Sequence, residues 1–196
     1  MVLCSIFSGA ILFLSCYKRT FSNMKNLPIP EIKNQEISDD YLTRFDFGRH
    51  FSQKKSYNWR DTKVPTDFGI ILSDIRYKPV DYYYFLKFNN WFKKMKFDNG
   101  ILPVDPKQNL DCDNFAMLYK STFGVASYQG GTDVEFAVAV VVVQQKNPFG
   151  GVPSGYLHML NLVFTNKDWY IFEPQTGQFI ELHKYPNQEF IQYIIL

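Results

Sequence analysis

The sequence predicts an α+β domain in which a helix is packed on an antiparallel sheet, because a helix-rich half precedes a strand-rich half. Two segments between positions 80 and 123 carry apolar side chains at helical spacing. Further along, three segments between positions 134 and 172 are rich in β-branched and aromatic residues, which favour strands.

Composition supports one folded domain. With 196 residues, of which 46% are apolar and 18% aromatic, the chain can bury a sizeable core and is not wholly disordered. Its 21 basic and 19 acidic residues leave a formal charge of +2, which is too balanced to attract nucleic acid. We therefore expect no nucleic-acid partner. The oligomeric state is left open.

The chain is predicted to begin with an apolar leader at 1–16 and a linker or arm at 17–40, followed by a single domain at 41–196. The leader is shorter than the ~20 residues that span a bilayer and is closer to the apolar region of a secretory signal. Phe13 to Cys16 resembles a lipoprotein cleavage box. This predicts a secreted or cell-envelope protein that can attach to a membrane through its leader. A start at Met24 would instead predict a cytoplasmic protein.

The first helix is expected from Val80 to Phe97 and to end at Asn99-Gly100. Its inner face is predicted to carry Tyr83, Leu86, Trp91 and Met95. The solvated face is predicted to carry Lys87, Lys93, Lys94 and Lys96.

The second helix is expected from about Asp113 to Phe123, with Gly124 as its C-terminal break. Asp111 is a good N-cap and places Cys112 in the first turn. The inner side is predicted to carry Phe115, Leu118 and Tyr119.

Val134 to Val143 is an almost unbroken β-branched run, which predicts a central strand buried on both faces. Tyr156 to Phe164 and Trp169 to Phe172 are expected to form a hairpin around the turn Asn166 to Asp168. Two short closing strands are predicted at Gln178 to Leu182 and Phe190 to Leu196.

Cys112, His158 and Glu173 together form a candidate catalytic set. A helix N-terminus and a neighbouring imidazolium favour the reactive thiolate form of a cysteine. The hairpin places residues 158–161 opposite 172–175, so Glu173 can accept the imidazole N–H and orient His158. Asn161 or Gln175 could act as a neutral orienter instead. Two structural alternatives stay open: Cys112 as a small core residue, and Glu173 as a strand-end charge.

Neighbouring residues qualify this prediction. The negative charges of Asp111 and Asp113 oppose formation of a Cys112 thiolate unless both carboxylates point away and accept capping hydrogen bonds. Gly150-Gly151 and Gly155 allow close backbone approach to the strand that carries His158.

Two patterns resemble known families. His-x-x-Asn-x-Val, a turn and Trp-Tyr-x-x-Glu-Pro resemble the core of transglutaminase-like enzymes, and Asp-Cys-Asp at a helix start resembles papain-like and cell-wall amidase families. The run from Asn109 to Leu182 most resembles the papain-like C-terminal domain of fungal agglutinins and related bacterial and phage proteins. The resemblance implies that Cys112 is the nucleophile, His158 the base and Glu173 the third member. Asp113 replaces the tryptophan that follows the nucleophile in many transglutaminases, which weakens protein cross-linking as the reaction.

The predicted function is therefore a cysteine hydrolase that cleaves an amide bond in a peptide or other amide substrate through a thioester. The alternatives are transglutaminase-like acyl transfer and a non-catalytic envelope or phage binding module on the same fold. Gln108 or Asn109 could supply a second oxyanion donor beside the Cys112 N–H.

We expect no cofactor and no metal. A zinc site would lack enough ligands, because no second cysteine or histidine lies near Cys112 and His158 in the sequence. The resembled agglutinin domain is calcium-activated, and Asp105, Asp111 and Asp113 could bind Ca²⁺, although the EF-hand spacing is absent.

Overall fold

The computed structural model describes residues 28–33, 36–37, 40–43, 70–71, 76–102 and 110–196. The predicted leader, Gln108, Asn109 and Asp105 lie outside these residues. Within the described ranges, the helices are too short or too polar to cross a membrane.

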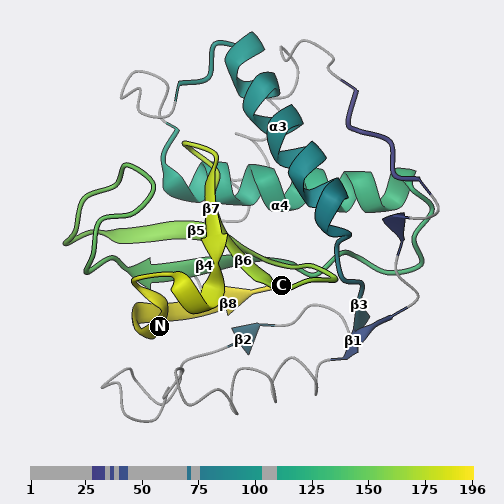
Figure 1. The fold of residues 1–196 in the computed structure, drawn as a ribbon. Coiled ribbons are helices and arrows are strands. Elements are labelled where there is room, and N and C mark those ends of the chain that lie inside the picture. Colours follow the sequence, from purple (N-terminus) through teal and green to yellow (C-terminus); the bar gives the residue numbers. More distant parts are fainter. Residues whose placement is uncertain (1–27, 34–35, 38–39, 44–69, 72–75, 103–109) are drawn as a thin grey trace, which may run out of the picture.

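Two helices, α3 (Tyr82–Asp98) and α4 (Cys112–Gln129), cross over one face of a six-stranded sheet (Figure 1). The sheet has the order β2-β8-β4-β5-β6-β7. Its strands are β2 (Ile70–Ile71), β4 (Val138–Gln144), β5 (Leu157–Phe164), β6 (Trp169–Glu173), β7 (Gln178–Glu181) and β8 (Ile191–Ile195). All neighbours are antiparallel except β2 and β8. The predicted α+β class with an antiparallel sheet is confirmed.

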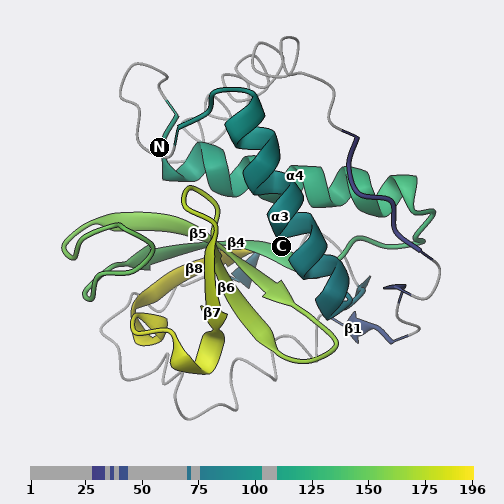
Figure 2. The same ribbon diagram turned by 45° about the horizontal axis from the view of Figure 1, so that its top comes forward.

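Smaller elements flank this arrangement. Strand β1 (Leu42–Thr43) pairs with β3 (Arg76–Tyr77) in a separate two-stranded sheet. Two short 3-10 helices, Leu182–Lys184 and Gln188–Phe190, connect β7 to β8. Strand β7 pairs with β6 at the edge of the sheet opposite β2, and it lies in front of the other strands in Figure 2.

Strand β4 is the predicted central strand. It pairs with β5 on one side and β8 on the other, and all its residues except Gln144 are buried. The strand begins later than predicted because the preceding residues bond elsewhere. Lys78 N–H donates to Glu135 O at 2.9 Å, and Ala137 N–H donates to Lys78 O at 2.8 Å.

Helix α3 begins and ends as predicted, but a different face is buried. Asp81 Oδ1 accepts the backbone N–H of Tyr83 and Tyr84 at the start, and Gly100 takes a φ of +67° just past the end. The Tyr83 side chain is 67% exposed, so its predicted inner position is wrong. The buried stripe is richer in large rings and comprises Tyr84, Phe85, Phe88, Phe92 and Met95. Burial of the larger apolar area decides the rotation of the helix.

The lysines of α3 divide in an unexpected way. Lys87, Lys93 and Lys94 are exposed as predicted, whereas Lys96 is only 5% exposed. Rotation of the helix turns Lys96 inward together with Met95, and the prediction of a solvated Lys96 is therefore wrong.

Helix α4 is longer than predicted. It continues through Gly124 to Gln129, and its C-cap is Gly130. The buried stripe of Tyr119, Phe123 and Ala126 continues at helical spacing past the glycine, and this packing outweighs the cost of about 1 kcal/mol of glycine inside a helix.

Aromatic packing fixes α4 against α3 and the sheet. The ring centroids of Phe88 and Phe123 lie 3.8 Å apart, and those of Tyr119 and Phe172 lie 4.3 Å apart. The β5–β6 hairpin has the predicted register, with Asn161 opposite Phe172 and the Thr165 N–H bonded to Asp168 O at 2.9 Å. These contacts hold the start of α4 and the ends of β5 and β6 in one rigid arrangement.

Candidate functional site

His158 and Glu173 lie at the same end of two neighbouring strands of the sheet. His158 is near the start of β5 and Glu173 is the last residue of the antiparallel neighbour β6. The His158 Nε2 is hydrogen-bonded to Glu173 Oε2, and the two residues are 3% and 0% exposed. A buried imidazole held this way by a carboxylate has a fixed orientation.

The second carboxylate oxygen of Glu173 is also bonded. Gln175 N–H donates to Glu173 Oε1 at 2.8 Å. The chain turns just after β6, so this amide points back at the carboxylate. Each oxygen of Glu173 thus has a donor, as a buried carboxylate requires.

Gly150 covers the side chain of Glu173. It has a φ of +64°, and a Cβ added to it would lie 2.6 Å from Glu173 Cγ. The backbone therefore approaches closely at Gly150, but toward Glu173 on β6 and not toward the strand that carries His158. Gly155 also has a positive φ, but no atom lies within 4 Å of an added Cβ. Glycine is therefore needed there for the backbone conformation of the turn and not for a close contact.

Gln145, which the sequence analysis missed, holds the loop that contains Gly150. Its buried Nε2 donates to Val152 O at 2.6 Å, and its backbone N–H donates to Tyr156 O at 2.8 Å. The only signal in the sequence is the pair Gln144-Gln145, which directly follows the apolar run that ends at Val143.

Cys112 is the first residue of α4, after the N-cap Asp111, as predicted. Its thiol is free and partly exposed. Burial acts to lower the pKa of His158, but hydrogen bonds to Cys112 and to Glu173 outweigh it and raise that pKa to about 9. Because Nε2 is bonded to the carboxylate, Nδ1 is the ring nitrogen left for Cys112. The structure therefore brings all three predicted residues together, with His158 between the other two.

The carboxyl groups that flank Cys112 interact with each other. Burial, together with the hydrogen bond and the charge of Asp111, raises the pKa of Asp113 to about 6. Asp113 Oδ1 also accepts Asn114 N–H at 2.8 Å, and Asn114 Oδ1 accepts Asp111 N–H at 3.2 Å. Asp113 thus takes part in the hydrogen bonds at this helix start, but with a pKa of about 6 it is still mainly ionised at neutral pH, so its charge continues to oppose a Cys112 thiolate.

Asn161 does not orient His158. Asn161 follows His158 by three residues in β5, and side chains an odd number of residues apart in a strand point to opposite faces of the sheet. There its Nδ2 donates to Ala116 O of α4 at 2.9 Å and to Ala139 O at 3.3 Å. Gln175 contributes through its backbone N–H, as described above. Asn161 instead ties α4 to the sheet.

No group of three metal-ligating side chains gathers in the part of the chain that the structure describes. Of the three acids considered for calcium, Asp111 and Asp113 are adjacent and Asp105 lies outside the described residues.

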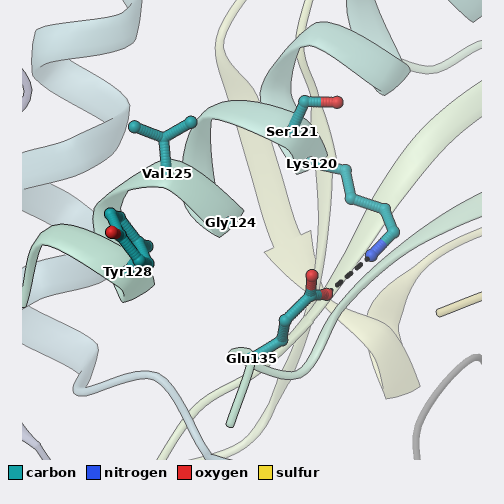
Figure 3. Close-up of a pocket in the computed structure, with 6 residues that line it drawn as sticks. All are labelled: Lys120, Ser121, Gly124, Val125, Tyr128 and Glu135. Atoms are coloured by element: carbon teal, nitrogen blue, oxygen red, sulfur yellow. Dashed lines mark hydrogen bonds and ion pairs between the residues drawn. The ribbon is translucent and has the colours of Figure 1, made fainter. Parts of the chain in front are cut away.

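A hollow on the outer side of α4 is separate from this site (Figure 3). It begins at Lys120, roughly 12 Å along the helix from Cys112. Lys120 Nζ pairs with Glu135 Oε2 across it at 3.5 Å, and Tyr128 beside it is 85% exposed. It holds none of the three predicted catalytic residues.

Comparison with known proteins identifies a fold likeness alone. No protein-family model and no curated protein matches the chain. A solved structure described as "PSL1a-E64 complex" matches with a TM-score of 0.51 and 13% identity, over 80% of this chain and 50% of that one. The chain thus spans about half the length of that structure. At 13% identity this likeness concerns the fold alone.

Proposed function

We propose that the protein is a papain-like cysteine hydrolase that cleaves an amide bond, in which Cys112 is the nucleophile, His158 the proton carrier and Glu173 the orienting group. The observation that carries this proposal is the position of His158, which is hydrogen-bonded to Glu173 through Nε2 and lies near enough to Cys112 for the thiol to raise the pKa of the imidazole. A nucleophile beside a base that is held by a third group is the arrangement of thiol and serine hydrolases.

The fold likeness adds modest support. The matched structure is a complex of PSL1a with E64. At 13% identity the likeness extends to the architecture and not to the chemistry, so the proposal rests on the three side chains.

The proposed reaction starts from a Cys112 thiolate beside protonated His158. The sulfur attacks the carbonyl carbon and the carbonyl π electrons move to oxygen, where the Cys112 N–H at the helix start donates to the oxyanion. The oxyanion then collapses, the C–N bond breaks, and the His158 Nδ1 proton passes to the leaving nitrogen. A thioester remains on Cys112.

Hydrolysis completes the cycle. Neutral His158 takes a proton from water, the oxygen attacks the thioester carbon, and the C–S bond breaks to release the acid and restore the thiolate. One amide and one water give one acid and one amine. Throughout, Glu173 keeps Nε2 bonded and stabilises the charged ring.

Thiol reactivity tests the proposal directly. In a Cys4→Ser/Cys16→Ser background, iodoacetamide should alkylate Cys112 at pH 7 roughly tenfold faster than free cysteine. His158→Ala should remove most of this advantage, whereas His183→Ala, at an exposed imidazole, should not. If Cys112 reacts at the rate of free cysteine and His158→Ala has no effect, the proposal is wrong.

Turnover is the second measurement. Wild type and Cys112→Ala would be compared on a library of fluorogenic peptide amides, with and without a primary amine such as putrescine. Product acid supports hydrolysis, and incorporation of the amine identifies acyl transfer instead. A reactive thiol with no turnover on any amide would favour a binding module.

A further inference from the structure

Lys96 is a buried cation behind the candidate site. It lies in the last turn of α3, and its Nζ donates to the carbonyl oxygens of Pro174 and Gln175, the latter at 2.6 Å. These two residues directly follow Glu173. The ammonium therefore holds the turn whose amide bonds the Glu173 carboxylate.

Burial makes the charge of Lys96 costly. Part of this cost is offset by two aromatic rings that attract the cation, because Nζ lies 5.4 Å from the ring centroid of Phe92 and 5.3 Å from that of Phe115. Burial lowers the pKa of Lys96 to about 8, the charge of Glu173 acts to raise it, and Lys93 lowers it further. The side chain is still mainly charged at neutral pH. Buried charges persist where they are paired or serve a purpose, because desolvation penalises them.

A continuous chain of contacts links Lys96 to the thiol. Lys96 bonds the Gln175 carbonyl, Gln175 N–H bonds Glu173 Oε1, and Glu173 Oε2 bonds His158. Cys112 in turn lies near enough to His158 to raise the pKa of its imidazole. With a thiolate, an imidazolium and a carboxylate, the three proposed catalytic groups carry a net charge of −1, which the ammonium of Lys96 balances.

We propose that Lys96 is a positioning residue for the His158–Glu173 pair, which it holds in place through the Pro174–Gln175 turn and whose excess negative charge it balances. This inference rests on the proposed function, since the charge to be balanced includes the Cys112 thiolate. It also assigns a role to a side chain that would otherwise be an unexplained buried charge.

Three substitutions separate the two contributions of Lys96. Lys96→Met removes the charge and the donors, Lys96→Gln keeps one donor without the charge, and Lys96→Arg keeps both. The matched control is Lys94→Met on the same helix, because the Lys94 side chain is 64% exposed. Each variant is made in the full chain that lacks Cys4 and Cys16.

The first readout is the imidazole of His158. The chain has three histidines, so ¹⁵N-histidine labelling gives three imidazole signals, and His158→Gln identifies the one of interest. In wild type and Lys94→Met, the Nε2 proton bonded to Glu173 should be protected and shifted downfield. In Lys96→Met we expect that proton to lose its protection, whereas Lys96→Gln and Lys96→Arg, which keep a donor for the Pro174–Gln175 turn, should retain it.

The second readout is the pH profile of Cys112 alkylation. Loss of a nearby positive charge disfavours the thiolate, so the midpoint of the rising limb should move up by about half a pH unit in Lys96→Met and Lys96→Gln, a threefold loss of rate below the midpoint. Lys96→Arg should restore the midpoint. A purely structural role would lower the melting temperature but would not move the midpoint or distinguish Arg from Met.

The two proposals fail in different ways. If wild-type Cys112 is no more reactive than free cysteine, the proposed function fails, and the His158 imidazole spectra still decide the positioning role of Lys96. If those spectra are the same in wild type and the folded Lys96→Met variant, the positioning role is wrong. If the alkylation midpoint of a reactive Cys112 is unchanged in Lys96→Gln, the charge-balancing role is wrong.

Discussion

The backbone of Gly150 packs directly against the side chain of Glu173, which places the loop before β5 over the buried carboxylate. A Cβ at Gly150 would come within 2.6 Å of Glu173 Cγ and would also be strained by the φ of +64°. The loop therefore packs against the Glu173 side chain that bonds His158, at a position that only glycine can occupy without rearrangement.

Gly150→Ala should displace Glu173 and destabilise the protein by roughly 2–4 kcal/mol, from overpacking and backbone strain together. Chemical denaturation and the rate of Cys112 alkylation would measure the two effects. Gly155→Ala is the matched control, because its φ of +97° gives strain without any nearby atom. Equal losses in both variants would contradict the contact with Glu173.

Protonated His158 should stabilise the folded state at neutral pH. Its pKa is raised from the ordinary value of 6.5 to about 9 by the hydrogen bonds to Cys112 and Glu173, against the effect of burial. The folded protein therefore binds this proton more tightly than the unfolded chain. The stabilisation is complete below about pH 6.5 and is lost as the pH rises through 9. The free energy of unfolding, measured by urea denaturation, should fall over this window in wild type and not in His158→Gln.

Lys96 should have the opposite effect on stability. Burial lowers its pKa from 10.5 to about 8, so between these values the unfolded chain holds a proton that the folded protein lacks. This contribution to the free energy of unfolding rises from pH 8 to 10.5. The rise should be absent from Lys96→Met and present in Lys94→Met. A parallel pH dependence of wild type and Lys96→Met would contradict it.

Asn161→Leu should destabilise the protein without changing the site. The substitution removes the bonds to Ala116 O and Ala139 O, at an expected cost of about 1–3 kcal/mol. The pH midpoint of Cys112 alkylation should be unchanged, because the bonds of Asn161 go to Ala116 O and Ala139 O and not to His158 or Glu173. A shifted midpoint would restore Asn161 as an orienter.

Gly124→Ala should stabilise the protein by about 0.5–1 kcal/mol, because Gly124 is inside α4 and alanine is the better helix former. The site has room, since the nearest atom to an added Cβ is Glu135 Oε1 at 3.8 Å. Thermal denaturation measures the gain. A loss of stability would show that the outer side of α4 is more crowded than this distance indicates.

The arrangement of the three candidate residues could be predicted because it depends on local rules. Asp111 specifies a helix start, and the turn at Asn166 to Asp168 fixes the hairpin register. From that register Glu173 follows as a neighbour of His158. The same strand periodicity excludes Asn161 from their side of the sheet.

Tertiary packing decided what the sequence alone could not. Two apolar stripes of α3 are possible, and only the opposing rings of α4 and β6 select the one that buries Phe88 and Phe92. That choice also turns Lys96 inward. The extension of α4 past Gly124 has the same origin, because the partners of Ala126 lie on other elements.

The position of β8 has a consequence for synthesis. Residues 191–195 fill the place between β2 and β4. Until they leave the ribosome, one long edge of the apolar strand β4 has no partner, and an open edge of this kind invites association with other chains. Nascent chains should therefore depend on a chaperone for soluble yield until these residues emerge, and shortening the protein before residue 191 should cause aggregation even though every candidate catalytic group is still present.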